Sequence, residues 1–407
     1  MTAPLQTLAS PHPEPEAQAS VRCRACQSQA TEVFYRVPNI PTNSVILLCN
    51  REDAVGFPRG RMELTLCRRC GFVFNASFEP VLAEYSSRYE ETQGFSATFR
   101  AWHMQLAEKL VARHDLHHKT ILEIGCGKGE FLSLLCELGS NRGIGFDPAW
   151  IPGRVPSSPD ITFVPDFYTS QSGSFDADFV CCKMTLEHVA HVSDFVRMVA
   201  ANFSSRPDTV VFFQVPDVDR ILAEGAFWDI YYEHCSYFGQ DSLRYLFESC
   251  GFSVIDIRRD YQDQYLMIEA RPAPSTATST AVPAFDAVAG VRKIRAFALK
   301  VGESMRESAE RVRRSIERGQ RMVLWGAGSK AVAWLTTLGV ERGVECVVDV
   351  NPHKHGSYLA GTGQLVVGPE YLAKYQPDLV LVMNPAYRDE VRLELRRLGL
   401  TPEVVCA

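Results

Sequence analysis

The sequence predicts an α/β protein in three parts, with a small metal-binding module at the N-terminus and two parallel-sheet domains after it. Two pairs of closely spaced cysteines come first, and strand–turn–helix units with glycine-rich turns begin at residues 120 and 322. A segment rich in Pro, Ser, Thr and Ala lies between these units. The expected parts are a disordered tail at 1–20, the module at 21–80, the first sheet domain at 81–270, a linker at 271–284, and a long helix with the second sheet domain at 285–407.

Length and composition are those of an ordinary globular protein. The 407 residues are 46% apolar and 22% charged, and the net charge of -6 argues against a nucleic-acid-binding surface. No apolar run is long enough to span a bilayer, and the first twenty residues lack the apolar core of a signal peptide. Thirteen cysteines suit a reducing compartment. We therefore expect a cytoplasmic protein, a monomer or homodimer, with neither a nucleic-acid nor a membrane partner.

The first four cysteines form two C-x-x-C pairs, Cys23 with Cys26 and Cys67 with Cys70. Each C-x-x-C turn directs two thiolates at one point, so two turns complete a closed tetrahedral site, which is typical of structural Zn²⁺. The alternatives are four unrelated reduced cysteines or two disulfides. The Arg and Gly residues in these turns are typical of zinc knuckles and favour zinc.

The first sheet domain begins with a short apolar strand at 120–124, a glycine turn at 125–129 and an amphipathic helix at 130–139. A second strand, 143–147, ends in an acid. Alternation of this kind predicts a parallel sheet. Later strands are expected at 179–182 and 209–214, and a helix at about 97–115 precedes the domain.

The C-terminal part repeats this pattern after a charged helix at 285–320. The repeat has a strand at 322–325, a turn at 326–330, a helix at 331–338, a strand at 344–349 that ends in an acid, and a later strand at 379–383. The similar openings of the two units suggest an ancient duplication.

The first glycine turn, Leu122-Glu-Ile-Gly-Cys-Gly-Lys-Gly129, needs small residues so that a ligand can approach the backbone. Glu123 before the turn and Asp147 after the next strand suit a ligand with an amino-acid end and a ribose, which matches S-adenosylmethionine. A flavin or nicotinamide unit, or a structural turn, is the alternative. The predicted cofactor-binding residues are Glu123, Gly125, Gly127, Asp147, Pro148, Asp166 and Phe167.

The pattern E-I-G-C-G-K-G with a later G-F-D-P resembles a class I methyltransferase. With the cysteine module before it and the second Rossmann-like unit after it, residues 23–407 resemble the three-domain, zinc-containing sugar C-methyltransferases that act on TDP-linked 4-keto-deoxyhexoses in antibiotic biosynthesis. The segment 228–238, WDIYYEHCSYF, is similar to the family's Y-x-E-H-F segment. The resemblance implies a zinc-bearing N-terminal domain, a central Rossmann-like cofactor domain and a second Rossmann-like domain that helps to close a nucleotide-sugar site.

C-methylation needs a carbon nucleophile, and a base that removes the proton next to a ketone creates one. By resemblance, His234 is that base, and Tyr231 and Glu233 line the sugar. His188, in T-L-E-H-V, matches the family's histidine after the fourth strand. Tyr89 lies where the family has an active-site tyrosine, although Tyr85 competes for that role. Packing is the alternative reading of these aromatic and histidine residues.

Two residues depart from the family's pattern. Tyr232 stands where well-known members have Asp, and Cys235 replaces an aromatic residue. We expect both changes to touch the sugar pocket, which leaves the exact substrate open.

The second glycine turn resembles a nicotinamide fingerprint that lacks its third glycine, and the family carries the same degenerate turn. Lys330, which could pair with a diphosphate, and Asn384, after a late strand, are candidate substrate contacts. The alternative is a structural lobe without a ligand.

The sequence thus predicts an S-adenosylmethionine-dependent C-methyltransferase for a nucleotide-linked keto-deoxysugar. One alternative is a methyltransferase that acts at C, O or N of another natural-product scaffold. Another is a binding or regulatory protein whose methyltransferase domain only senses the cofactor.

Overall fold

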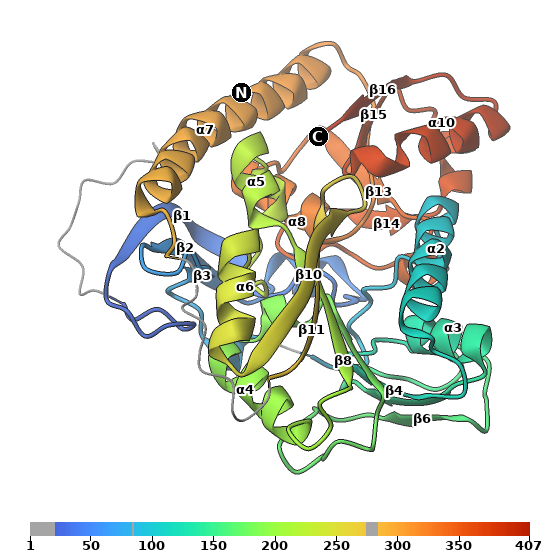
Figure 1. Cartoon of the computed structure of the whole chain (residues 1–407). Coiled ribbons are helices and arrows are strands. Elements are labelled where there is room, and N and C mark those ends of the chain that lie inside the picture. The colour runs from blue at the N-terminus through green and yellow to red at the C-terminus, as the bar shows by residue number, and fades with distance from the viewer. Residues whose placement is uncertain (1–20, 84, 274–283) are drawn as a thin grey trace.

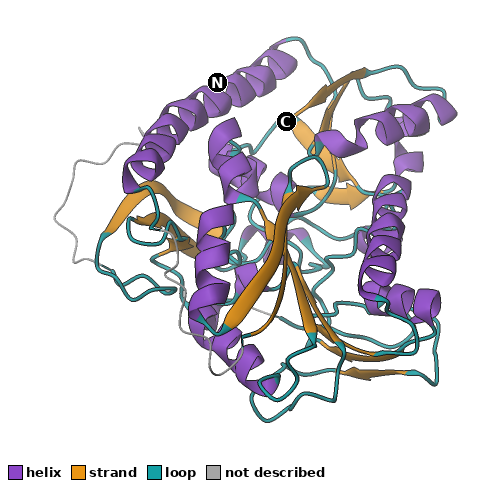
Figure 2. Cartoon of the chain, viewed as in Figure 1, coloured by secondary structure: helices purple, strands orange, loops and turns teal. Residues whose placement is uncertain are grey.

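The computed structural model describes residues 21–83, 85–273 and 284–407 and contains three sheets (Figure 1). The expected tail and all but the ends of the expected linker lie outside the described residues. Figure 2 shows helices packed around the two larger sheets, whereas the N-terminal part is mostly strand and loop. No helix in the described ranges is long and apolar enough to cross a membrane.

The N-terminal sheet is antiparallel and takes its last strand from the central domain. Its order is β1-β2-β3-β9, with β1 at Thr31–Pro41, β2 at Arg59–Cys67, β3 at Val73–Asn75 and β9 at Ser236–Tyr237. The short helix α1, Arg51–Val55, lies between β1 and β2, and the 3-10 helix η1, Pro80–Leu82, follows β3. Strand β9 begins two residues after His234, so the segment that carries the predicted base is part of the N-terminal sheet.

The central sheet has seven strands in the order β10-β11-β8-β7-β4-β5-β6. Five of them are parallel, and β11 runs antiparallel to both of its neighbours. The carboxyl ends of the parallel strands therefore meet at one edge, where such sheets bind ligands. The strands are β4 Thr120–Ile124, β5 Arg142–Phe146, β6 Ile161–Val164, β7 Phe179–Lys183, β8 Val210–Pro216, β10 Phe252–Asp260 and β11 Tyr265–Pro272.

Strand β11 ends at Pro272, so the first two residues of the expected linker belong to the sheet. The predicted helices agree closely with the structure. Helix α2 begins after Ser96, whose hydroxyl accepts a hydrogen bond from the Phe99 amide, and ends before Asp115 in left-handed conformation. The helices of this domain are α2 Ala97–His114, α3 Glu130–Gly139, η2 Leu186–His188, α4 Val192–Asn202, α5 Val218–Glu224, η3 Phe227–Asp229 and α6 Gln240–Ser249.

The C-terminal part consists of a long helix and a five-stranded parallel sheet of order β14-β13-β12-β15-β16. Helix α7, Ala287–Glu317, is capped by the preceding Asp286, whose carboxylate accepts hydrogen bonds from the amides of Val288 and Ala289. The strands are β12 Met322–Trp325, β13 Val344–Val348, β14 Leu365–Val367, β15 Leu379–Val382 and β16 Glu403–Cys406. The helices are α8 Ser329–Leu338, η4 Pro352–Lys354, η5 Pro369–Tyr371, α9 Leu372–Tyr375, η6 Pro385–Tyr387 and α10 Arg388–Arg397.

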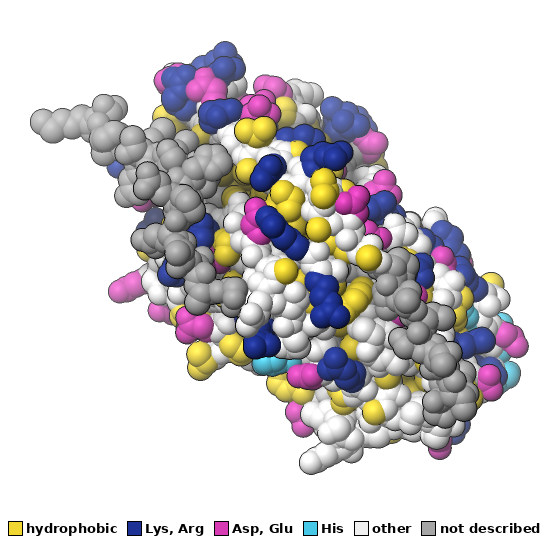
Figure 3. Space-filling view, turned by 60° about the vertical axis from the view of Figure 1, so that its left-hand side comes forward, with side chains coloured by type: hydrophobic (Ala, Val, Ile, Leu, Met, Phe, Trp, Pro, Cys, Tyr) yellow, Lys and Arg dark blue, Asp and Glu magenta, His cyan; other side chains and the backbone are white. Residues whose placement is uncertain are grey.

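One hydrophobic core joins all three parts. It includes Met62 of the N-terminal sheet, Phe227 of the central domain, Phe297 of α7 and the fully buried Trp334 of α8. Burial of such side chains contributes about 1.5–3 kcal/mol each. The shared core fixes the parts relative to one another. Charges of both signs are interspersed with hydrophobic side chains on the face drawn in Figure 3.

Candidate active site

A cavity of about 690 Å³ lies where residues after the strands of both parallel sheets meet. Its wall includes both glycine turns, η2 and the segment before β9. Every predicted cofactor, substrate and catalytic residue lines this cavity except Glu233. The lining residues among them are Glu123, Gly125, Gly127, Asp147, Pro148, Asp166, Phe167, Tyr89, His188, Tyr231, His234, Lys330 and Asn384.

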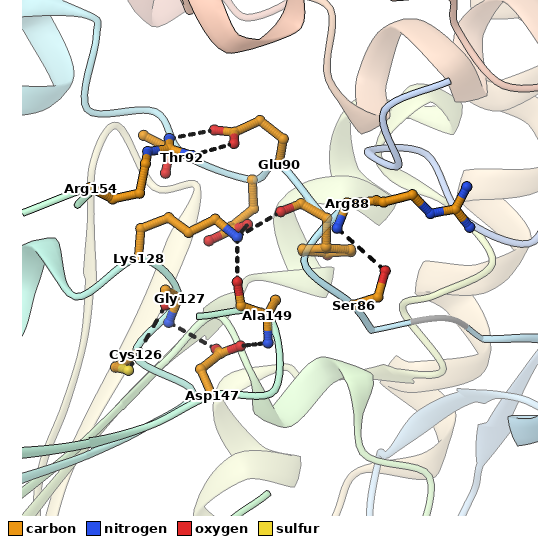
Figure 4. Close-up of polar contacts among 12 residues, drawn as sticks. Ser86, Arg88, Glu90, Thr92, Cys126, Gly127, Lys128, Asp147, Ala149 and Arg154 are labelled. Carbon is orange, nitrogen blue, oxygen red and sulfur yellow. Dashed lines mark hydrogen bonds and ion pairs between the residues drawn. The ribbon is translucent and has the colours of Figure 1, made fainter. Parts of the chain in front are cut away.

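The first glycine turn joins β4 to α3. Gly125 has a φ of 72°, and a Cβ atom there would lie 2.0 Å from the Thr185 hydroxyl, so no other residue fits. Asp147, after β5, holds the turn through both carboxylate oxygens. These oxygens accept from the amide of Gly127 at 2.8 Å and the amide of Ala149 at 2.7 Å (Figure 4). The turn is thereby shaped before any ligand arrives.

Lys128 was not among the predicted site residues, and it connects a covering segment to this turn. Its buried ammonium donates to the carbonyls of Tyr89 at 2.8 Å and Ala149 at 2.6 Å (Figure 4). The covering segment, residues 85–95, carries both tyrosine candidates. The sequence signal that could have indicated this role is a lysine inside a glycine-rich turn, where a small residue would suffice.

The covering segment is also tied to the two sheet domains. Both guanidinium ends of Arg154, which follows β5, donate to Glu90, at 2.7 and 2.9 Å (Figure 4). The side chain of Asn351, after β13, donates to the same carboxylate at 2.8 Å. Glu90 is almost completely buried, so these charge-assisted bonds replace its hydration.

The cavity fits a ligand with a cationic amino-acid end and an aromatic base. Glu123 is buried, and its Oε2 atom has no hydrogen-bond partner among the residues that the structure describes. Burial raises the pKa of Glu123 to about 7, so a cationic ligand would favour its ionised form. Phe167 is 59% exposed on the cavity wall and offers an uncovered ring for stacking.

An aromatic cluster surrounds His234, which also lines the cavity. The ring centroid of His234 lies 4.2 Å from that of Tyr231 and 4.7 Å from that of His188. The Tyr85 hydroxyl lies 3.0 Å from Nδ1 of His188, whereas the Tyr89 ring is 6.5 Å from the His188 ring. Both tyrosines line the cavity, and Tyr85 makes the direct polar contact with a predicted catalytic residue.

Burial keeps both histidines neutral near pH 7. It lowers the pKa of His188 to about 4. It lowers the pKa of His234 well below its usual value, and the neighbouring His188 and Lys330 lower it further. A neutral imidazole can accept a proton, which is what a base in this cavity requires.

Comparisons with known proteins identify the class of enzyme. Residues 96–257 match the methyltransferase domain family, and residues 276–399 match the C-methyltransferase C-terminal domain family. The C-methyltransferase NovU of Streptomyces niveus is 27% identical over 363 residues, which cover 85% of each chain. This chain is an S-adenosylmethionine-dependent C-methyltransferase.

Solved methyltransferase structures are similar over part of the chain. Magnesium protoporphyrin IX methyltransferase from Synechocystis PCC 6803, with bound S-adenosylhomocysteine, is 17% identical and covers 45% of this chain and 90% of its own, with a TM-score of 0.34. An S-adenosylmethionine-dependent methyltransferase from Listeria monocytogenes, described as putative, is 15% identical and covers 42% and 99%, with a TM-score of 0.33.

Glu233 of the C-methyltransferase lies behind the cavity wall and not in it. Its buried carboxylate accepts hydrogen bonds from the backbone amide of Ser44, at 3.0 Å, and from the Ser44 hydroxyl. Burial raises its pKa to about 7. Glu233 therefore connects the His234 segment to the N-terminal module, and the expectation that it lines the sugar does not fit this placement.

The two departures from the family's pattern also lie outside the cavity lining. Tyr232 is fully buried, and its hydroxyl accepts a hydrogen bond from the Glu79 amide at 2.9 Å. The Cys235 thiol is directed at the Glu187 carbonyl, 3.7 Å away. Since neither side chain reaches the cavity, the expectation that they alter the sugar pocket is wrong.

The second glycine turn is held by an aspartate in the same way as the first. Asp349, after β13, accepts from the amides of Ala327 and Asn351, both at 2.8 Å, as Asp147 does in the central domain. Lys330 forms an ion pair with buried Asp229, which also pairs with Arg220. The repeated geometry agrees with the suggested duplication.

Asn384 already has a side-chain partner at the cavity wall. Its amide group exchanges two hydrogen bonds with Gln264, at 2.9 and 3.2 Å. Asn384 therefore links the second sheet domain to the loop before β11, and a ligand would meet this amide pair rather than an isolated side chain.

The four cysteines of the N-terminal module form one cluster away from the cavity. Their sulfur atoms lie within 4.8 Å of one another, with 3.7 Å between Cys23 and Cys70 and 3.5 Å between Cys26 and Cys67. Four thiolates about 2.3 Å from a tetrahedral zinc ion would be about 3.8 Å apart. The cluster therefore fits a zinc ion, and all four cysteines are free of disulfides.

Proposed function

We propose that this C-methyltransferase methylates the carbon next to the ketone of a nucleotide-linked keto-deoxysugar, with His234 as the base. The observation that carries the proposal is a buried histidine, with a pKa that burial lowers, on the wall of a cavity that both glycine turns share. When bound, S-adenosylmethionine supplies the methyl group.

The residues that would hold the cofactor lie around the first turn. The amides of the Gly125–Gly129 turn and the carboxyl groups of Glu123 and Asp147 suit its amino-acid end and ribose, and Phe167 suits its adenine. The covering segment lies over this turn through Lys128, which supports a role in excluding water from the reaction.

His234 would remove the proton from the carbon next to the ketone. The neighbouring groups then stabilise the charge that develops on the carbonyl oxygen, since Tyr231 is a phenol donor on the same wall. General-base removal of this kind contributes roughly 10²–10⁴-fold to a rate.

The cavity extends to the second sheet domain, which supports a nucleotide sugar as the substrate. Gly328, Ser329 and Lys330 line it at the N-terminus of α8, where backbone amides and the helix dipole favour phosphate. Lys330 is held by Asp229, so a diphosphate would compete with this ion pair.

A structural zinc ion in the cysteine cluster is part of the same proposal. The spacing of the sulfur atoms and their position outside the lining of the reaction cavity support a closed site that stabilises the module rather than takes part in the reaction. A cytoplasmic location stays a prediction.

Mass spectrometry with isotopically labelled S-adenosylmethionine tests the function. We would screen TDP-, UDP- and GDP-linked 4-keto-deoxysugars and expect one of them to gain the label on carbon. If every keto sugar stays unlabelled while a scaffold without an enolisable ketone is methylated, the proposed substrate class is wrong.

A further inference from the structure

Glu187 lies in the wall of the reaction cavity with a carboxyl group that has no partner. It is the residue before His188 in η2 and is 1% exposed. Neither of its carboxyl oxygens has a hydrogen-bond partner in the part of the chain that the structure describes. A carboxyl oxygen of Glu187 and ring nitrogens of His188 and His234 lie within 4.8 Å of one another. An acid thus lies beside the proposed base.

The surroundings of Glu187 keep this acid neutral. No lysine or arginine in the described ranges pairs with it, and an isolated buried carboxylate costs several kcal/mol. Burial raises the pKa of Glu187 to about 8, so the carboxyl group keeps its proton at neutral pH. The titratable groups that face it are Tyr85, Cys182, His188, Tyr231, His234 and Cys235.

Glu233 is the other buried acid near His234, and its contacts differ. Ser44 donates two hydrogen bonds to Glu233, whereas the carboxyl group of Glu187 has no hydrogen-bond partner among the described residues, and Glu187 lines the cavity. A buried carboxyl group without a partner, on a residue that lines a ligand cavity, indicates that the partner belongs to the ligand.

We propose that Glu187 is the catalytic acid that donates its proton to the carbonyl oxygen of the ketone while His234 removes the proton from the adjacent carbon. The C–H electron pair forms the new carbon–carbon double bond, and the carbonyl π pair moves to oxygen, which takes the Glu187 proton. The products are a neutral enol, a Glu187 carboxylate and a His234 imidazolium. When the enol carbon accepts the methyl group, the C–S bond of the sulfonium breaks and its electron pair stays on the thioether that leaves. The enol proton returns to Glu187, the carbonyl is restored, and His234 releases its proton to solvent.

The spacing favours this exchange of protons. The step creates one negative and one positive charge on groups whose titrating atoms lie within 4.8 Å, so that each stabilises the other. The base and the acid also act on adjacent atoms of one ketone, which this separation can span. This inference rests on the proposed function.

Infrared difference spectroscopy tests the ionisation of Glu187 without any substrate. The spectrum of the wild-type protein minus that of Glu187→Gln should show the carbonyl stretch of a protonated carboxyl group at pH 7. We expect this band to disappear as the pH rises through about 8. A difference band that titrates near the ordinary glutamate value, or no band, overturns the proposal whatever the true substrate is.

Proton exchange in D₂O tests the catalytic role, with a TDP-linked 4-keto-6-deoxyhexose as the probe and no cofactor. The wild-type exchange rate should fall above about pH 8 as Glu187 ionises. Glu187→Gln keeps the shape but cannot give up a proton, so exchange should fall by roughly 10²-fold or more and lose this pH dependence.

Two further variants complete the exchange experiment. Glu187→Asp retains a titrating acid and should regain part of the rate together with a fall at high pH. Glu137→Gln, on the exposed face of α3, should match the wild type. A folded Glu187→Gln protein with the wild-type rate and the wild-type pH profile would overturn the role. A wild-type protein that exchanges no proton of the keto sugars contradicts the proposed substrate class instead, and the infrared titration separates these failures.

Discussion

At the scale of single residues, burial decides the chemistry of the cavity. It lowers the pKa of His234 and raises that of Glu187, so a base and an acid are both neutral in one site. The sequence predicted His234 and His188 through a motif, but it could not predict that Glu233 binds Ser44, which lies 189 residues earlier in the chain. Contacts of this separation depend on the finished fold.

The lowered pKa of His234 predicts how the exchange rate depends on acid. A base whose folded pKa lies well below 6.5 remains neutral as the pH falls through 6.5. Exchange of the substrate α-proton, measured from pH 8 down to pH 5, should therefore not halve near 6.5. An acid limb centred at or above 6.5 would show that His234 is not buried in the working enzyme.

Asp147 offers a second residue-scale prediction, with a matched control. Asp147→Ala removes two backbone contacts and the proposed ribose acceptor, so S-adenosylmethionine binding should weaken by about 1.5–3 kcal/mol in calorimetry. Asp349→Ala removes the same two contacts from the second turn and should leave cofactor affinity unchanged. Equal losses in the two variants would mean that the cofactor does not lie at the first turn.

At the scale of elements, the sequence predicts the units that local patterns determine, but it does not predict which distant segments pair. The strand–turn–helix units were predicted almost to the residue, because apolar strands, glycine turns and helix caps are local signals. The pairing of β9 with β3 was not, because Ser236 and Phe74 come together only through the fold. The same holds for the ion pair of Lys330 with Asp229, 101 residues apart.

The covering segment, residues 85–95, yields a prediction at this scale. Lys128→Met keeps the length of the side chain but removes its hydrogen bonds to the Tyr89 and Ala149 carbonyls. Since hydrogen bonds to charged groups contribute about 1.5–3 kcal/mol, amides of the segment should exchange with deuterium roughly ten-fold faster or more. Lys109→Met, on the exposed face of α2, is the control. Unchanged exchange in Lys128→Met would mean that other contacts hold the segment.

At the scale of the whole molecule, the N-terminal cysteine module and the reaction site form one structure. Strand β9 belongs to the N-terminal sheet, and Glu233 of the same segment is bound by Ser44 of the module. We expect one zinc ion per chain by metal analysis, and its removal by a chelator should lower the melting temperature and the rate of proton exchange together. Protein without zinc, with four freely titratable thiols and full stability, would contradict this.

The central claim is that His234 forms the enol from the substrate ketone, and one measurement tests it most directly. The exchange of the keto sugar's α-proton with D₂O, without cofactor, reports this step and does not require methyl transfer. We predict that His234→Asn folds and binds S-adenosylmethionine, yet exchanges the proton roughly 10²–10⁴-fold more slowly than the wild type. Exchange by His234→Asn at the wild-type rate would contradict the account. Another residue would then be the base, and His188 would be the next candidate.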